Sequence, residues 1–312
     1  MRSPHLFHNH NSMIKTRFLP RTAAVVLLAT AWFPSGAFAA GFSESANATA
    51  TDNELDDPLV LYSLGQKHLK GDGVPRDNVK AFTLLQKAAN LQHAEAMAAV
   101  GYLYSVGLGV QQDDGQARAC FAMAEENGSV AGRVNLGLFL IRGRGGDKDV
   151  EKGVALLRKA AEGGNKPAAV RLGEIFFFGE HADGRPDYRK AHDVLIAAAE
   201  AGDPAAQNMV GVILLRGYLG DKDEVSARIW LEKAALQGHA KACANLADCW
   251  NFRSTERAAR IEAIRWLIVA KNLQETTATA TLQDVRASLA PDELLAAQEL
   301  AETTLENISK AK

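Results

Sequence analysis

Apolar residues return along this chain at a fixed interval. A leucine or valine followed by glycine, or by alanine in the last copy, is found at Leu64-Gly65, Val100-Gly101, Leu136-Gly137, Leu172-Gly173, Val210-Gly211 and Leu246-Ala247. Successive copies are 36, 36, 36, 38 and 36 residues apart. A period of this length predicts a repeat array, in which each unit buries its apolar face only against its neighbours.

A second apolar pattern keeps the same period and predicts a helix in each unit. In the first unit it runs Ala81, Leu85 and Ala88, which is a small, a large and a small residue at steps of four and three. The large position is Leu85, Phe121, Leu157, Leu195, Leu231 or Leu267. Such steps put all three residues on one helical face, where small side chains let a second helix come close.

Each unit therefore reads as two antiparallel helices. The first carries the Leu-Gly step and ends near a glycine such as Gly71 or Gly107, and a loop rich in glycine, proline and aspartate follows. No segment alternates with period two, so the fold class is all-α. The predicted units are 57–92, 93–128, 129–164, 165–202, 203–238 and 239–274.

The repeated residues resemble the Sel-one-like repeat (SLR), a relative of the tetratricopeptide repeat. The second unit matches the first half of that pattern best, at Gly101, Tyr104, Gly107, Gly109, Val110 and Asp113. The resemblance covers residues 57 to 274 and implies a right-handed α-solenoid of about six helix pairs with a concave groove. The sixth unit departs from the pattern, because Ala247 replaces the glycine. Residues 275–312 resemble the C-terminal capping helix and tail seen after such arrays.

The first 39 residues have the pattern of a secretory signal peptide. Lys15, Arg17 and Arg21 precede an apolar stretch from Ala23 to Phe33, and Ala37-Phe38-Ala39 offers the small residues that a signal peptidase accepts. Cleavage is expected after Ala39, and residues 40–56 form a polar linker. The apolar stretch is short for a membrane span. A periplasmic or secreted location without a remaining membrane span follows; a buried or anchoring helix is the alternative.

Charge argues against nucleic acid as a partner. Loss of the signal peptide would remove four of the 35 basic residues and none of the 37 acidic ones. A mildly acidic chain lacks the clustered lysine and arginine that bind phosphates or anionic lipid.

Side chains that could carry catalysis are sparse. The three cysteines, Cys120, Cys243 and Cys249, are too widely placed to pair and are expected as buried apolar residues, with a redox role as the alternative. The histidines after residue 39 show no ligand spacing, so no metal or cofactor is expected. No activated nucleophile is evident. We therefore expect a protein that is not an enzyme.

The family resemblance places a partner-binding groove on the first helix of each pair. Positions three before, one after and four after the Leu-Gly glycine, with their neighbours, give the candidate residues. These are Tyr62, Gln66, Tyr102, Ser105, Leu138, Ile141, Arg142, Glu174, Phe177, Phe178, Asn208 and Arg216. Apolar area with a few polar groups is typical of protein interfaces. The alternative is that part of this set lies in the core.

These observations predict a non-catalytic scaffold that binds another protein or peptide. Two alternatives remain open from the sequence. One is an envelope protein that binds peptidoglycan fragments or β-lactams, as some cysteine-rich SLR proteins do, although this chain lacks their disulfide spacing. The other is a periplasmic inhibitor of a membrane sensor.

Overall fold

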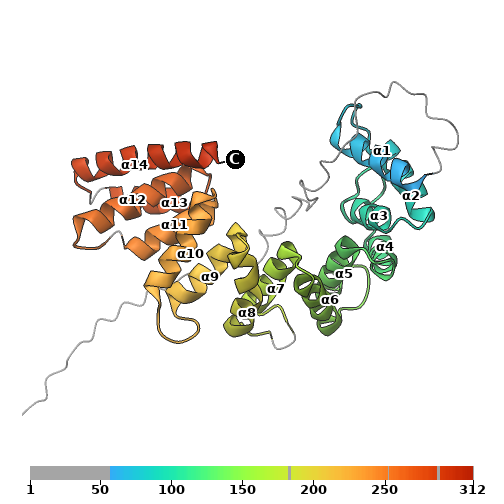
Figure 1. The fold of residues 1–312 in the computed structure, drawn as a ribbon, viewed down its shortest axis with the longest axis horizontal. Helices are drawn as coiled ribbons and strands as arrows, with labels where there is room; N and C mark the ends of the chain where they lie inside the picture. The colour runs from blue at the N-terminus through green and yellow to red at the C-terminus, as the bar shows by residue number, and fades with distance from the viewer. Residues whose placement is uncertain (1–56, 182–183, 252, 287–288, 312) are drawn as a thin grey trace, which may run out of the picture. The chain divides into compact units, whose positions relative to one another are not determined.

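The chain folds as a succession of helical hairpins (Figure 1). The computed structural model describes residues 57–181, 184–251, 253–286 and 289–311, and no strand occurs among them. The first helices of six hairpins are α1 (Pro58–Lys70), α3 (Ala94–Val106), α5 (Val130–Arg142), α7 (Lys166–Phe178), α9 (Pro204–Arg216) and α11 (Ala240–Trp250). The second helices are α2 (Asn78–Asn90), α4 (Asp114–Glu126), α6 (Val150–Glu162), α8 (Tyr188–Glu200), α10 (Glu224–Leu236) and α12 (Arg257–Asn272). The predicted signal peptide and linker lie outside the described residues.

Helices contact their neighbours in chain order. Each first helix packs against the second helix of its own hairpin, and each second helix packs against the first helix of the next. First helices also contact one another, α3 with α5, α7 with α9, and α9 with α11. This nearest-neighbour packing is that of an α-solenoid, and the predicted all-α fold class is confirmed.

Polar caps fix where the helices begin and end. Five second helices start after an aspartate whose carboxylate accepts a hydrogen bond from a backbone amide in the first turn, as Asp113 accepts from Gln116. Five first helices end at a glycine in the left-handed conformation, such as Gly107 with a φ of 70°. Because these caps recur with the period, the first five hairpins close in the same way.

The Leu-Gly glycines allow the two helices of a hairpin to touch. A Cβ atom added to Gly101 would lie 2.8 Å from the ring of Phe121, and one added to Gly65 would lie 2.7 Å from Cγ of Leu85. All six large residues of the second-helix pattern are almost completely buried. The small-large-small face predicted from the sequence is therefore the core of each hairpin.

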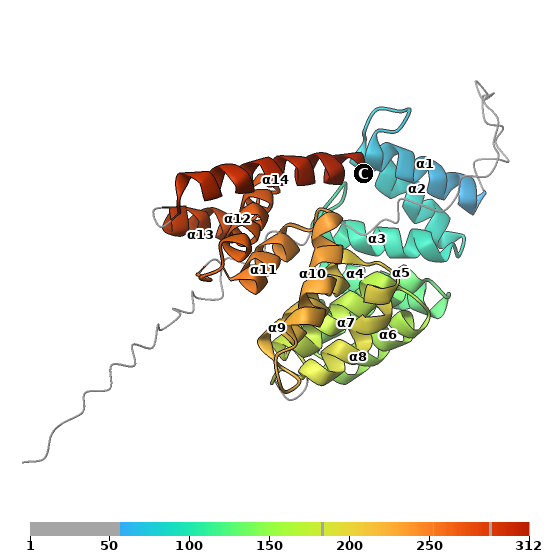
Figure 2. The same cartoon turned by 60° about the vertical axis from the view of Figure 1, so that its left-hand side comes forward.

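The sixth hairpin and the C-terminal segment differ from the regular units. Helix α11 has 11 residues instead of 13 and ends before Asn251, whose φ is 54°. After it, α13 (Thr276–Arg286) and α14 (Pro291–Lys310) both pack on α12 (Figure 2). The segment predicted to hold one capping helix thus holds two. An ion pair between Arg260 and Glu293 joins α14 to α12.

Candidate interaction surface

The accessible side of the first helices is formed by positions two before, one after and five after the Leu-Gly glycine. On α5, α7 and α9 we call these positions the first-helix surface. It consists of Asn135, Leu138, Arg142, Arg171, Glu174, Phe178, Met209, Val212 and Arg216, all half-buried or exposed. Steps of three and four residues keep each set of three on one side of its helix.

The twelve residues predicted for the groove fall into three groups in the structure. Arg142, Phe178 and Arg216 are exposed. Tyr62, Gln66, Tyr102, Leu138, Glu174 and Phe177 are half-buried. Ser105, Ile141 and Asn208 are buried. The exposed residues all occupy the position five after the glycine, and the half-buried ones lie mostly one after it.

The three buried residues are turned away from solvent. Ile141, 3% exposed, lies against Gly153 of α6 in the core. The hydroxyl of Ser105, 7% exposed, donates a hydrogen bond to the carbonyl of Tyr102 in its own helix. Asn208, 8% exposed, accepts a 2.8 Å hydrogen bond from Asn245 of α11. The helix face predicted from the sequence therefore includes part of the core, and these three residues offer no surface to a partner.

The position two before the glycine was missed by the sequence reasoning. Asn135, Arg171, Met209 and Asn245 occupy it in four units and are half-buried. These side chains are polar or long, whereas position three before the glycine holds mainly alanine and valine. This contrast in polarity between two adjacent columns was a usable signal.

Polar contacts on this side fix several of the side chains. Arg171 pairs with Glu174 at 2.7 Å within α7, and Arg216 of α9 pairs with Asp248 of α11 at 3.0 Å. Exposed ion pairs of this kind contribute little to stability. The second pair joins neighbouring units and orients Arg216 toward the sixth hairpin.

Four aromatic rings gather where α7 ends, and we call them the aromatic cluster. Phe177 lies at the centre, with ring centroids 5.0 Å from Phe178, 5.2 Å from Tyr188 and 5.9 Å from Tyr218. Tyr188 comes from the start of α8, and Tyr218 follows the glycine that caps α9. Phe178 is 64% exposed and Tyr218 is 41% exposed. The cluster is thus a patch of accessible aromatic area shared by two repeats.

A second aromatic contact occurs at the N-terminal end of the described chain. The ring of Tyr62 stacks on the imidazole of His93 with centroids 4.7 Å apart. Burial, with a smaller effect from the charge of Glu95, raises the pKa of the Tyr62 hydroxyl. His93 also accepts a hydrogen bond from the amide of Ala96 at the start of α3. The stacked pair therefore joins the first two repeats.

The thiols lack the features of reactive groups. Cys120, Cys243 and Cys249 are free and buried, as expected from the sequence. Burial raises the pKa of all three, that of Cys243 to about 12. A thiol of this kind carries almost no thiolate near neutral pH. Among the described residues, no group of histidine, cysteine and acidic side chains is arranged to hold a metal ion.

The described helices are short or polar for a membrane environment. None of them combines the length and the apolar character needed to cross a bilayer.

Comparison with known families finds one repeat type over most of the described chain. The Sel1 repeat profile matches residues 58–93, 94–129, 131–165, 166–203 and 204–239. These matches coincide with the first five hairpins. The sixth hairpin, where the sequence departs from the repeat pattern, is not matched.

The chain is also similar to several known proteins and structures. A crystal structure of a Sel1 repeat protein from Oxalobacter formigenes is 26% identical, covers 71% of this chain and 90% of its own, and superposes with a TM-score of 0.63. Chitin synthase regulatory factor 3 of Schizosaccharomyces pombe is 28% identical over 217 residues, which are 67% of this chain. Chitin synthase regulator SKT5 of Saccharomyces cerevisiae is 27% identical over 233 residues, or 71% of this chain. The matches span only 23% and 33% of these two relatives.

Proposed function

Because the chain belongs to the Sel1 repeat family, we propose that it is a non-catalytic scaffold that binds a partner protein on its first-helix surface. Proteins of this family generally act in protein interactions, and an array of hairpins offers a continuous surface for them. The two curated relatives are named as regulators of chitin synthase. A regulatory role that works through binding is consistent with this proposal.

The observation that carries the proposal is the exposed ring of Phe178 on a base of other aromatic rings. Phe178 belongs to the first-helix surface, and Phe177 beneath it holds the cluster together. Aromatic residues at the centre of an interface contribute much of its binding energy. Charged neighbours such as Arg142 and Arg216 are suited to the polar rim of such a contact.

Site-specific crosslinking tests this proposal. A photoreactive phenylalanine analogue at position 178 should give one defined crosslinked protein in cells that express the chain. The same analogue at Val225, an exposed apolar position on α10, should not capture that protein. Equal capture at both positions, or none at position 178, would rule out a partner on this surface. Labelled penicillin should leave the purified chain unmodified, which separates the scaffold from a β-lactam-binding protein.

We also propose that residues 1–39 direct the chain to the periplasm or to secretion. The proposal is supported by the basic segment, the apolar stretch and the small residues that end at Ala39. Mass spectrometry of the protein from a periplasmic fraction should find an N-terminus at Ala40. A chain that keeps residues 1–39 and stays in the cytoplasm would contradict it.

A further inference from the structure

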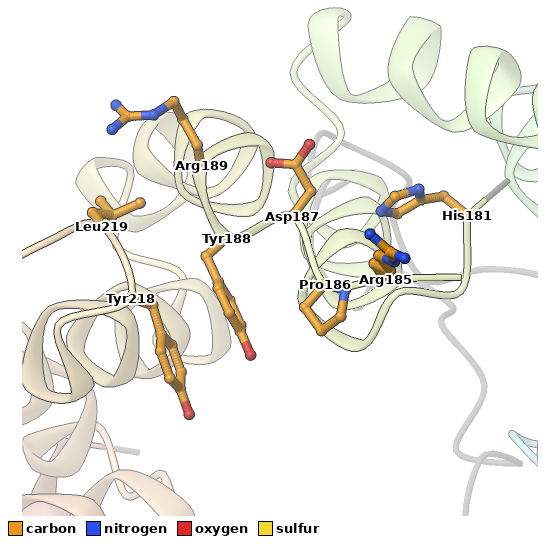
Figure 3. Close-up of a pocket in the computed structure, with 8 residues that line it drawn as sticks. All are labelled: His181, Arg185, Pro186, Asp187, Tyr188, Arg189, Tyr218 and Leu219. Atoms are coloured by element: carbon orange, nitrogen blue, oxygen red, sulfur yellow. The ribbon is translucent and has the colours of Figure 1, made fainter. Parts of the chain in front are cut away.

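A cavity of about 610 Å³ lies beside the aromatic cluster, between the loops that follow α7 and α9. Figure 3 shows His181 and Arg185 together on one side of it, with Tyr188 and Tyr218 side by side on the other. Pro186 lies between these two pairs. The guanidinium groups of Arg185 and Arg189 lie at different ends of this arrangement.

The cavity is found where two loops depart from the repeat pattern. In the second and third repeats the corresponding loop position is glycine, and a Cβ atom there would lie 2.0 Å from a backbone oxygen of the preceding repeat, Asn78 for Gly109 and Asp114 for Gly145. These loops therefore lie directly on the preceding repeat. In the fourth and fifth repeats the position holds His181 and Leu219. Their side chains exclude such an approach, and the loop of the fourth repeat is also two residues longer.

The charges that line the cavity favour an anion. Asp187 is the one carboxylate among the described lining residues. It caps α8 by accepting a 2.9 Å hydrogen bond from the backbone amide of Lys190, and it pairs with the ammonium of the same residue at 2.9 Å. These bonds hold the pKa of Asp187 below its usual range. Among the described residues neither Arg185 nor Arg189 forms an ion pair, so two cations remain for a ligand.

Two further features indicate what else the ligand should carry. The Nε2 atom of His181 is buried and has no hydrogen-bond partner among the described residues. On the opposite side, the rings of Tyr188 and Tyr218 stack with centroids 4.0 Å apart and planes 12° from parallel. They line the cavity as one stacked pair, on which an apolar or aromatic side chain can pack.

We propose that this cavity binds an acidic peptide segment of the partner, with two separated carboxylates that meet Arg185 and Arg189 and an aromatic side chain between them that packs on Tyr188 and Tyr218. Arginine is well suited to carboxylates because its planar group can form two parallel hydrogen bonds. The proposal rests on the scaffold function proposed above and adds the chemistry of the partner. The 41% exposure of Tyr218 leaves its ring open to such a contact.

Peptide binding to the full chain tests this inference. The probe is a fluorescein-labelled peptide of aspartate and glutamate residues around one phenylalanine, titrated by fluorescence anisotropy. Its matched controls carry asparagine and glutamine in place of the acids, or alanine in place of the phenylalanine. The acidic probe should bind about tenfold or more tightly than the amide peptide, because hydrogen bonds to charged groups are the stronger ones. Its affinity should fall as salt is added.

Variants of the chain locate the binding. Arg185→Ala and Arg189→Ala should each weaken the acidic probe by about tenfold or more, and Tyr218→Ala should remove the preference for phenylalanine. Arg76→Ala is the control, because Arg76 is an exposed loop arginine next to the aspartate cap of α2. An unchanged affinity in the Arg185→Ala, Arg189→Ala double variant would overturn the proposal. So would equal binding of the acidic and amide peptides.

Inorganic phosphate serves as a competitor. If it displaced the probe at concentrations as low as the unlabelled acidic peptide does, the cavity would be a site for small anions and the peptide proposal would be wrong. Crosslinking from position 178 is an independent readout. A partner captured there without any binding of the acidic probe would retain the scaffold function and remove only the acidic-peptide inference.

Discussion

The ring of Tyr218 lies parallel to the ring of Tyr188 at a centroid distance of 4.0 Å, although the two residues belong to neighbouring repeats. Tyr218 follows the glycine cap of α9, and Tyr188 is the first residue of α8. In the third repeat the residue after the cap has a similar role, because Arg144 pairs with Asp114 of the repeat before it. The same loop position therefore joins two hairpins in the third and fifth repeats, and in the fifth the joining group is aromatic.

Replacing Phe178 and Phe177 by alanine should have different effects. Phe178→Ala should leave the melting temperature nearly unchanged, because its ring is 64% exposed, and should weaken partner capture. Phe177→Ala should cost about 1–2 kcal/mol of the free energy of unfolding, since three other rings lose a contact. Urea unfolding of both variants separates the two roles. Val225→Ala is the control for loss of an exposed apolar side chain, and equal destabilisation by both phenylalanine variants would contradict their assignment.

Replacing Gly137 by leucine should destabilise the third hairpin. A Cβ atom at this position would lie 2.9 Å from the carbonyl oxygen of Gly153 and 3.1 Å from Leu157. We expect a loss of about 1–3 kcal/mol, because overpacking forces the two helices apart. Gly163→Ala is a suitable control, since its Cβ would make only ordinary contacts and its φ of −76° suits alanine. An unchanged melting temperature for Gly137→Leu would contradict the close contact of α5 and α6.

Glycine at position 92 should stabilise the protein. Gln92 has a φ of 65°, in a column where Gly128, Gly164, Gly202 and Gly238 have similar values. Gln92→Gly should gain about 0.5–1 kcal/mol, because relief of the left-handed strain exceeds the added entropy of the unfolded chain. Gln92→Ala keeps the strain and should show no gain. A lower melting temperature for Gln92→Gly would show that the Gln92 side chain contributes more than its backbone strain costs.

Acidification should weaken the cap of α11. The Nδ1 atom of His239 accepts a hydrogen bond from the amide of Ala242, which requires an unprotonated nitrogen. Burial and then the charge of Lys241 lower the pKa of His239 from 6.5, while Asp203 and Glu275 oppose this shift. The unfolded chain therefore takes up the proton at a higher pH than the folded chain. The stability that the uncharged His239 contributes is fully present above about pH 6.5 and is lost as the pH falls below that value.

His239→Asn tests this pH dependence. Asparagine caps α7 at the equivalent position, where Asn165 accepts from the amide of Ala168, and it does not titrate. The melting temperature of the variant should therefore decline less between neutral and mildly acidic pH than that of the wild type. If the melting temperatures of the two proteins fell equally with pH, His239 would not be the source of the pH dependence.

The repeat register could be predicted from the sequence because the same close contact between helices recurs along the array. The small-large-small face is present in each unit and the glycine of the step in the first five, since close helix contacts tolerate few alternatives, as the tight fit of Gly101 on Phe121 shows. The surface was harder to predict. Positions three before and four after the glycine lie near position one after it, but their burial depends on the neighbouring helices, which one sequence does not place. Ile141 is buried against α6 of its own hairpin, and Asn208 contacts α11 of the next one.

The periodic pattern could not predict the cavity or the aromatic cluster. Tyr188 and Tyr218 lie at a helix start and in a loop, 30 residues apart in the sequence, and only the stacking of hairpins brings them together. The replacement of a loop glycine by His181 and Leu219 was visible in the sequence. Its consequence depends on how closely the loops of the other repeats approach, which requires coordinates. Only one of the two helices after residue 274 was predicted, because no repeat pattern extends to this segment.

The burial of all three thiols makes this chain suitable for selective chemical labelling. Alkylating reagents react with thiolates, and Cys243, with a pKa of about 12, offers almost none near neutral pH. A new cysteine on an exposed helix position would therefore react first, without prior removal of the native ones. Fluorophores or spin labels attached in this way could report distances between chosen hairpins while a partner is added.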